Sequence, residues 1–270
     1  RWIQIGPFTL QPSEFAKLIM IICLARLLST NHTGFKTWKS LIPVAGMMFL
    51  PTILIFIQPD LGTSLVFAAI AFGMLYICGL RMELVKRALI ALVVMFPVIW
   101  FFVLHSYQKM RILVLFNPSV DPYGSGYHVI QSKISIGSGG FLGQGLFEGT
   151  QSQLNFLPEN HTDFIFSVIG EELGFIGAIF VIFLYFVLLY RTIMISRSSG
   201  DSFGSLLACG IFSMWLFQVF INVGMTLGIM PVTGIPLPFM SYGGSALVMN
   251  LLCVGILMNI YLRRKKLMFD

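Results

Sequence analysis

Seven long apolar stretches constrain this chain more than any other feature of its sequence. They cover residues 14–31, 41–57, 62–80, 87–105, 164–190, 205–228 and 244–262. A helix needs about 20 apolar residues to cross a hydrocarbon core of about 30 Å. The stretches are continuous and lack the alternation of a membrane β-barrel, so they favour helices. The sequence therefore predicts an all-α polytopic membrane protein with seven transmembrane helices.

The composition agrees with a membrane protein and excludes other classes. Hydrophobic residues make up 57% of the chain and charged residues 10%, whereas about a quarter of a soluble domain is charged. The net charge of +6 is explained by a basic rim that meets anionic lipid headgroups, so the expected partners are membrane lipids and not nucleic acid. The cysteines lie inside apolar stretches without a CxxC motif, and we predict no metal site. Those cysteines are Cys23, Cys78, Cys209 and Cys253.

The distribution of basic residues predicts the orientation, because positive charge marks the cytoplasmic side. Eleven of the 17 basic residues fall on one side, namely Lys36, Lys39, Arg81, Lys86, Arg87, Arg191, Arg197, Arg263, Arg264, Lys265 and Lys266. The other side holds Arg1, Lys109, Arg111 and Lys133. The C-terminus is therefore expected in the cytoplasm. Seven spans then place Arg1 outside without a signal peptide, so we expect an odd number of further spans upstream, the alternative being a chain that starts outside.

Two outer connections differ from ordinary loops. Residues 106–162, between the fourth and fifth spans, are too many for a structureless loop, and we expect an extracytoplasmic subdomain. Within it, residues 127–136 predict a short amphipathic helix at the membrane interface. The glycine-rich residues 137–145 do not fit the G-x-G-x-x-G spacing, which favours a turned surface loop over a nucleotide site. The Pro/Gly-rich residues 229–243 are equally consistent with a rigid turn and with a cavity wall.

Ionisable residues stand out against this apolar background. Asp163 lies where a polar cluster runs into the fifth span, and a carboxylate is costly to keep there. Glu14 and Lys17 are three residues apart in the first span, so they can pair on one helix face. Lys17 is then either part of a helix-entry ion pair or a contact for an anionic ligand. Asp60 is equally consistent with a cap of the third span and with a site role.

Five motifs occur in order along the whole chain. They are Arg1-Trp2, QPSEFAK (11–17), QPDLGTS (58–64), FLPENHTDFIFSVIGEELG (156–174) and PVTGIPLPFMSYGGS (231–245). Their order and spacing are similar to those of the SEDS family of bacterial envelope proteins. GTQSQLNFLPE (149–159) before HTDFIF looks more like the RodA elongation branch than the FtsW division branch. Members of the family have ten spans, so the chain resembles one that lacks its first three.

This resemblance implies a peptidoglycan glycosyltransferase that polymerises lipid II at the outer face of the bacterial cytoplasmic membrane. It also implies a class B penicillin-binding protein as the partner that cross-links the strands. The essential aspartate of the family matches Asp163, which would act as the general base for the attacking sugar hydroxyl. Burial would favour the neutral acid of Asp163 and a helix N-terminus its carboxylate, and the sequence leaves both open.

The leaving pyrophosphate needs cations, and charge-assisted contacts to phosphate are strong. Lys17 and Arg111 are the favoured residues, and Arg1 and Lys109 are further candidates. The remaining expected substrate-binding residues lie in or beside the motifs and are Glu14, Asp60, Glu159 and Ser241. No cofactor is indicated, although a divalent cation could assist the pyrophosphate.

A glycosidase-like pair of carboxylates is excluded by helix geometry. Eight residues of helix would separate Asp163 from Glu171 by about 12 Å, beyond the roughly 5–9.5 Å of such pairs. Glu171 and Glu172 are instead expected to make polar contacts between helices. Gly170, Gly174 and Gly177 agree with this, because small residues at helical spacing let another helix approach.

Two other functions fit parts of the sequence. A lipid II flippase or other transporter would also use polar residues, broken segments and an outer cavity. Against it, the ionisable residues cluster at the outer face, and no inverted repeat is present. A membrane scaffold for wall enzymes would leave Asp163 unexplained.

Overall fold

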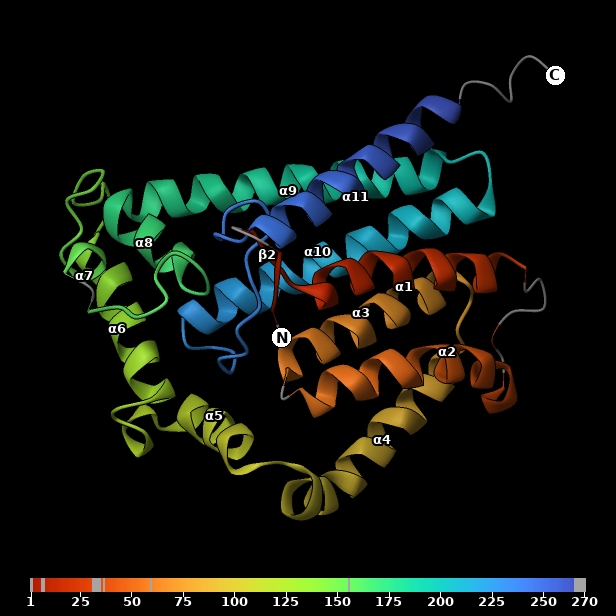
Figure 1. Ribbon diagram of the computed structural model, residues 1–270, viewed down its shortest axis with the longest axis horizontal. Coiled ribbons are helices and arrows are strands. Elements are labelled where there is room, and N and C mark those ends of the chain that lie inside the picture. Colours follow the sequence, from red (N-terminus) through yellow and green to blue (C-terminus); the bar gives the residue numbers. More distant parts are fainter. Residues whose placement is uncertain are drawn as a thin grey trace. The chain divides into compact units, whose positions relative to one another are not determined.

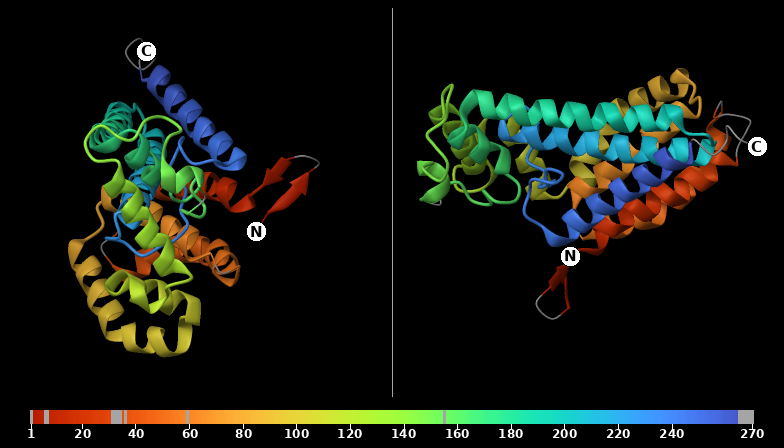
Figure 2. Two further views of the ribbon diagram at one scale, coloured as in Figure 1. Left: turned by 90° about the vertical axis from the view of Figure 1, so that its left-hand side faces the viewer. Right: turned by 90° about the horizontal axis from the view of Figure 1, so that it is seen from above.

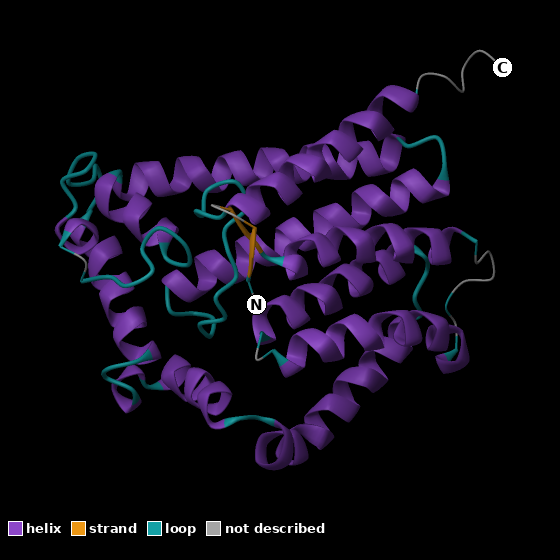
Figure 3. Cartoon of the chain, viewed as in Figure 1, coloured by secondary structure: helices purple, strands orange, loops and turns teal. Residues whose placement is uncertain are grey.

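The computed structural model describes residues 2–5, 8–30, 35, 37–58, 60–154 and 156–264, and their regular secondary structure is almost entirely helical (Figure 1, Figure 3). They form two compact units. The first comprises Arg1–Leu92, Val187–Phe217 and Gly243–Asp270, and the second comprises Val93–Phe186 and Gln218–Tyr242. Three helices, α4 (Met82–Val98), α9 (Gly174–Ser198) and α10 (Ser202–Thr226), each contribute residues to both units.

The first unit begins with a β-hairpin, the one departure from an all-α fold among the described residues. Strands β1 (Ile3–Ile5) and β2 (Phe8–Leu10) pair antiparallel, with Ile3 opposite Leu10. This hairpin projects from the start of α1 (Figure 2). Strands of three residues are too short to show alternation above background, so the sequence did not predict this hairpin.

The rest of the first unit is a helical bundle. It consists of α1 (Pro12–Ser29), α2 (Trp38–Ile57), α3 (Leu61–Ile77), α11 (Gly244–Arg263) and the adjoining parts of α4, α9 and α10. Helix α1 contacts α2, α3 and α11. Helices α3 and α10 approach closely at Gly73, where a β-carbon would lie 1.9 Å from Ser213 Oγ. Trp215 is fully buried and donates from Nε1 to Asn250 Oδ1 at 2.8 Å.

Five helical segments in the described part of the chain are long and apolar enough to cross a membrane. They are Trp38–Ile57, Met82–Val103, Gly174–Ser198, Ser202–Thr226 and Gly244–Arg263. The other two expected spans coincide with α1, which carries Glu14, Lys17 and Arg26, and with α3, which has 17 residues. Helix α4 exposes most of its apolar side chains, as a lipid-facing helix does. The chain is therefore an all-helical polytopic membrane protein apart from its hairpin.

The fifth expected span is not one continuous helix. It is divided into α8 (Ile165–Glu172) and α9, which begins at Gly174. Gly174 has φ +65°, a left-handed conformation that interrupts a helix and favours glycine. N–H groups at the start of α9 have no acceptor within the helix and donate to a neighbouring loop. Phe175 donates to the carbonyl of Gly140, and Ile176 donates to the carbonyl of Phe141. The fourth span likewise ends in a π-helix, η1 (Ile99–Val103), after Pro97.

The second unit contains the long connection between the fourth and fifth expected spans, residues 106–162. It includes α5 (Ser106–Phe116), the 3₁₀ turn η2 (Pro118–Val120), α6 (Ser125–Ser138), α7 (Thr150–Gln153) and α8. Helix α6 confirms the helix expected at 127–136. Its buried face carries Gly126, Val129, Ser132 and Ser135, and it packs against α8.

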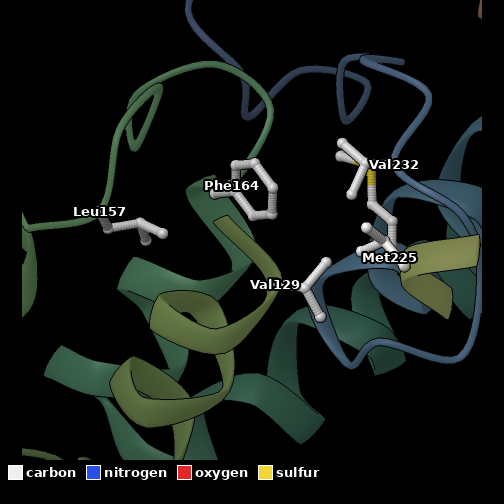
Figure 4. Close-up of a cluster of buried hydrophobic side chains, with 6 residues drawn as sticks. Val129, Leu157, Phe164, Met225 and Val232 are labelled. Atoms are coloured by element: carbon white, nitrogen blue, oxygen red, sulfur yellow. The ribbon is translucent and has the colours of Figure 1, made fainter. Parts of the chain in front are cut away.

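A small apolar core joins these elements within the second unit. Its members are Val114, Val129, Leu157, Phe164, Met225 and Val232, five of which are labelled in Figure 4. Phe164 directly follows Asp163 and is 2% exposed. The residue beside the predicted base is therefore anchored in the core.

Candidate active site

A pocket of about 500 Å³ in the second unit includes Asp163. It is lined by Ser106, Tyr107, Met110, Arg111, Asp121, Ser125, His128, Glu159, Asp163, Phe164 and Val232. The pocket brings together three carboxyl groups, one guanidinium and one imidazole. Of the residues expected from the sequence, Asp163, Arg111 and Glu159 share this pocket.

Asp163 lies in a turn that precedes α8. The N–H groups of Thr162 and Phe164 both donate to the carbonyl of Glu159 at 3.2 Å. Glu159 itself has φ +52°, which is uncommon for a residue with a side chain and marks a strained turn. The carboxylate of Glu159 accepts from Thr162 Oγ1 at 3.0 Å. This turn and the buried Phe164 fix the main chain on both sides of Asp163.

Arg111 is positioned by helix α5. The start of α5 is capped by Gln108, whose Oε1 accepts from the N–H of His105 at 2.9 Å. Tyr107 and Arg111 are four residues apart, so they share one helix face. The Arg111 guanidinium lies 5.8 Å from the centre of the Tyr107 ring. Lys109, on the same helix, is not among the residues that line the pocket.

His128 was not singled out by the sequence. Its ring stacks on Phe164 with centroids 5.8 Å apart and planes 7° apart. Its Nδ1 atom is buried and has no hydrogen-bond partner among the described residues. Burial lowers the pKa of His128, and Arg111 acts in the same direction, while Glu159 and Asp121 oppose them. The net shift is downward, which favours the neutral imidazole.

Asp121 is the third carboxyl group of the pocket. Its Oδ2 accepts from the N–H of Ser125 at 2.8 Å and from Ser125 Oγ at 3.0 Å. Both bonds fix the first residue of α6. Asp121 stands three residues before Gly124, the N-cap of α6.

The Pro/Gly-rich segment 229–243 contributes a wall of the pocket through Val232. Ser241 does not line the pocket but fastens this segment to the turn that carries Asp163. Its Oγ donates to the carbonyl of Thr162 at 2.6 Å and accepts from the N–H of Leu237 at 2.7 Å. The N–H of Tyr242 donates to the carbonyl of His161 at 2.9 Å. These contacts favour the cavity-wall alternative for this segment.

Glu171 is fully buried and connects three helices of the second unit. Its carboxylate accepts from Ser135 Oγ of α6 at 2.9 Å, and from the N–H groups of Gln151 at 2.7 Å and Ser152 at 3.2 Å. Asn160 Nδ2 donates in turn to the carbonyl of Ser152 at 2.9 Å. The expected polar contacts between helices are confirmed for Glu171, and they extend to the segment that carries Asp163.

The remaining candidates belong to the first unit or lie outside the described residues. Lys17 Nζ and Glu14 Oε1 are 2.6 Å apart, with side chains 1% and 2% exposed, which confirms the expected ion pair. Asp60 caps α3, since its Oδ1 accepts from the N–H of Thr63 at 3.1 Å. Arg1 lies outside the described residues. Within the described part of the chain, no group of three or more His, Cys, Asp and Glu residues could hold a metal ion.

The pocket combines two chemical abilities. A carboxylate within hydrogen-bond reach of a substrate hydroxyl can take its proton. A guanidinium can hold phosphate oxygens through two parallel hydrogen bonds. Such a pair suits a reaction in which a hydroxyl attacks and a phosphate departs.

Known proteins are similar to this chain in sequence along nearly its whole length. The chain is 43% identical to peptidoglycan glycosyltransferase MrdB of Escherichia coli over 267 residues, which are 99% of this chain and 72% of that protein. It is 42% identical to stage V sporulation protein E of Bacillus subtilis over 262 residues, covering 96% and 70% of the two chains.

Solved structures show the same fold. A chain of a peptidoglycan synthase complex that coordinates polymerization and crosslinking is 31% identical with a TM-score of 0.84, over 97% of this chain and 73% of that chain. The rod shape determining protein RodA of Thermus thermophilus is 29% identical with a TM-score of 0.66, over 97% and 69%. Residues 1–266 also match the family of cell cycle proteins that comprises FtsW, RodA and SpoVE. The chain therefore belongs to the FtsW, RodA and SpoVE family.

Proposed function

We propose that this chain is a peptidoglycan glycosyltransferase that polymerises lipid II, with Asp163 as its general base. The observation that carries the proposal is that Asp163 and Arg111 line one pocket. The 43% identity to peptidoglycan glycosyltransferase MrdB supports the reaction class.

The reaction requires one proton acceptor and one anion holder. A sugar hydroxyl of the acceptor attacks the anomeric carbon of the donor glycan, and the bond from that carbon to the lipid pyrophosphate breaks. Asp163 takes the hydroxyl proton, and the departing pyrophosphate leaves with the bonding electrons. A placed general base typically contributes a factor of about 10²–10⁴ to the rate.

Arg111 is proposed to hold the pyrophosphate. The oxygens of the leaving group gain negative charge as the bond breaks, so a fixed guanidinium stabilises the transition state. Glu159, on the turn of Asp163, is proposed to accept hydrogen bonds from sugar hydroxyls. Lys17, Lys109 and Arg1 are further candidates for the phosphates, and Glu14, Asp60 and Ser241 for the substrate.

The biological setting is proposed on the same basis. We place the chain in the bacterial cytoplasmic membrane with seven spans, its C-terminus in the cytoplasm and the pocket outside. The motif at 149–159 supports a role in cell elongation. The synthase complex to which one similar solved chain belongs supports a class B penicillin-binding protein as the cross-linking partner.

The orientation has a direct test by cysteine labelling in intact cells. Two variants are compared, Tyr123→Cys and Gly200→Cys. Position 123 is in the long connection 106–162, and position 200 is between α9 and α10. A membrane-impermeant thiol reagent is expected to label position 123 and to spare position 200. Labelling of position 200 alone would reverse the proposed topology.

The reaction has its test in liposomes that contain the full-length protein and its transpeptidase partner. Labelled lipid II is supplied on the outer side, and glycan strands are separated by gel. Wild type is expected to form strands, and Asp163→Asn is expected to form none. Asp201→Asn, an exposed aspartate outside the pocket, is the matched control and should retain activity. Polymer formation by Asp163→Asn contradicts the base role, and lipid crossing without polymer supports the flippase.

A further inference from the structure

Asn222, near the end of α10, holds the main chain of Asp163. Its side chain is 0% exposed. Its Nδ2 donates to the carbonyl of Asp163 at 3.0 Å and to the carbonyl of Ile235 at 2.8 Å. A primary amide has two N–H groups, so both bonds form at once. One side chain thus joins the turn that carries Asp163 to the segment that carries Val232 and Gly234.

The orientation of this amide is determined by its partners. An amide oxygen and nitrogen differ little in shape, but only the nitrogen can donate to two carbonyl groups. The Oδ1 atom of Asn222 is buried and has no hydrogen-bond partner among the described residues. Leaving a buried acceptor without a partner destabilises the folded chain. The amide uses both of its donors and leaves its acceptor without a described partner, which points to a role for the two donated bonds.

The two hydrogen bonds from Asn222 hold the main chain beside the Asp163 carboxylate, whose position determines whether it can take the substrate's proton. Asp163 and Phe164 are adjacent, and Phe164 is fixed in the core of the second unit. Asn222 fixes the peptide carbonyl between them, and Gly234, from the segment that holds Ile235, lies against the Asp163 carboxylate. A displacement of about 1 Å in a reacting group can cost about 10²-fold in rate.

We infer that Asn222 is a positioning residue, which acts on the reaction only through the placement of Asp163. The inference rests on the proposed function of Asp163 as the general base. Asn222 is not among the residues that line the pocket. Its loss should therefore lower kcat and leave the binding of lipid II nearly unchanged.

The test compares two buried amides on α10. Asn222→Leu removes both donors and keeps the number of side-chain heavy atoms. Gln218→Leu, one turn earlier, removes a buried amide that makes no described hydrogen bond to the Asp163 turn. We expect Asn222→Leu to lower kcat about 100-fold with KM for lipid II within about threefold of wild type. Gln218→Leu should leave kcat within about threefold, and both thermal midpoints are measured in detergent. Equal kcat values for the two variants at equal midpoints would overturn the inference.

A double-mutant cycle separates positioning from general stability. Asp163→Glu keeps a carboxylate but already displaces it. If Asn222 acts only through Asp163, adding Asn222→Leu to Asp163→Glu should cost less than about 10-fold, well below its cost in wild type. A full additive loss means that Asn222 acts elsewhere, and the inference fails.

Three further outcomes keep the test decisive. If Asn222→Leu does not fold, Asn222→Ser, which is smaller and keeps one donor, takes its place in the same comparison. If Asp163→Asn polymerises normally, the proposed base is wrong and Asn222 has nothing to position. If Asp163→Asn is inactive while Asn222→Leu keeps its kcat, only the inference about Asn222 fails.

Discussion

Gly234 lies against the carboxylate of Asp163, so that a β-carbon built on it would be 3.2 Å from Asp163 Oδ2. Gly234 also has φ +73°, a conformation that costs a residue with a side chain about 1–2 kcal/mol. Gly234→Ala should therefore both strain the segment and displace the carboxylate. The polymerisation rate is expected to fall by up to about 100-fold, measured with lipid II in liposomes.

Gly140→Ala is the matched control for this prediction. Gly140 has φ +54° in the same unit, but nothing lies within 4 Å of the position of its β-carbon. Gly140→Ala therefore introduces a similar backbone strain but makes no contact with Asp163. Equal activities for Gly234→Ala and Gly140→Ala would show that the contact with Asp163 does not matter.

Arg111 should determine affinity for the pyrophosphate. A hydrogen bond to a charged group contributes about 1.5–3 kcal/mol, so Arg111→Ala is expected to lower kcat/KM about 10- to 100-fold. Arg111→Lys keeps the charge but loses the planar fork, and it should recover only part of this loss. Lys109→Ala, on the same helix but outside the pocket lining, should cost less. A larger loss for Lys109→Ala would move the phosphate site away from Arg111.

The sequence predicted the helices that depend on long apolar stretches, and it missed the features that depend on single residues. The apolar stretches located α2, α10 and α11 because burial in a membrane demands continuous hydrophobicity. The break at Gly174 was missed, since its partners Gly140 and Phe141 come from a distant loop. The sequence predicts one continuous span where the interruption of the helix is stabilised only by tertiary contacts.

The candidate site divides in the same way. Asp163, Arg111 and Glu159 could be named in advance, because ionisable residues stand out in an apolar chain. His128 and Asn222 could not, since a histidine or asparagine in a helix is ordinary until its neighbours are known. The role of Asn222 depends on its hydrogen bonds to the carbonyls of Asp163 and Ile235, and the sequence alone does not show these contacts.

Glu171 should be essential for stability rather than for chemistry. Its carboxylate accepts three hydrogen bonds in a fully buried position. Glu171→Gln removes the charge and one acceptor, and each lost bond to a charged group costs about 1.5–3 kcal/mol. The thermal midpoint in detergent is expected to fall. Glu172→Gln, at the neighbouring half-buried position, should leave the midpoint nearly unchanged, and equal midpoints would refute this role of Glu171.

His128 should make the second unit less stable in acid. Burial holds the pKa of His128 below its usual value, so the unfolded chain takes up the proton more readily. The stabilising effect of the neutral ring is complete above the usual pKa of about 6.5 and is lost as the pH falls through that range toward the lower folded value. The thermal midpoint should drop on acidification, and His128→Gln should reduce the drop. His161→Gln, at an exposed position outside the pocket lining, should not reduce it.

The crossing of α6 and α8 should tolerate no side chain at Gly139. A β-carbon at Gly139 would lie 2.0 Å from the carbonyl oxygen of Gly170 and 2.8 Å from that of Glu171, and backbone atoms cannot move aside cheaply. Gly139→Ala is expected to cost about 1–3 kcal/mol of overpacking. Gly137→Ala, two residues earlier, meets nothing within 4 Å and should stabilise the helix by about 0.5–1 kcal/mol. The two variants should thus shift the thermal midpoint in opposite directions. Because α6 carries His128 and α8 follows Asp163, only Gly139→Ala should also slow polymerisation.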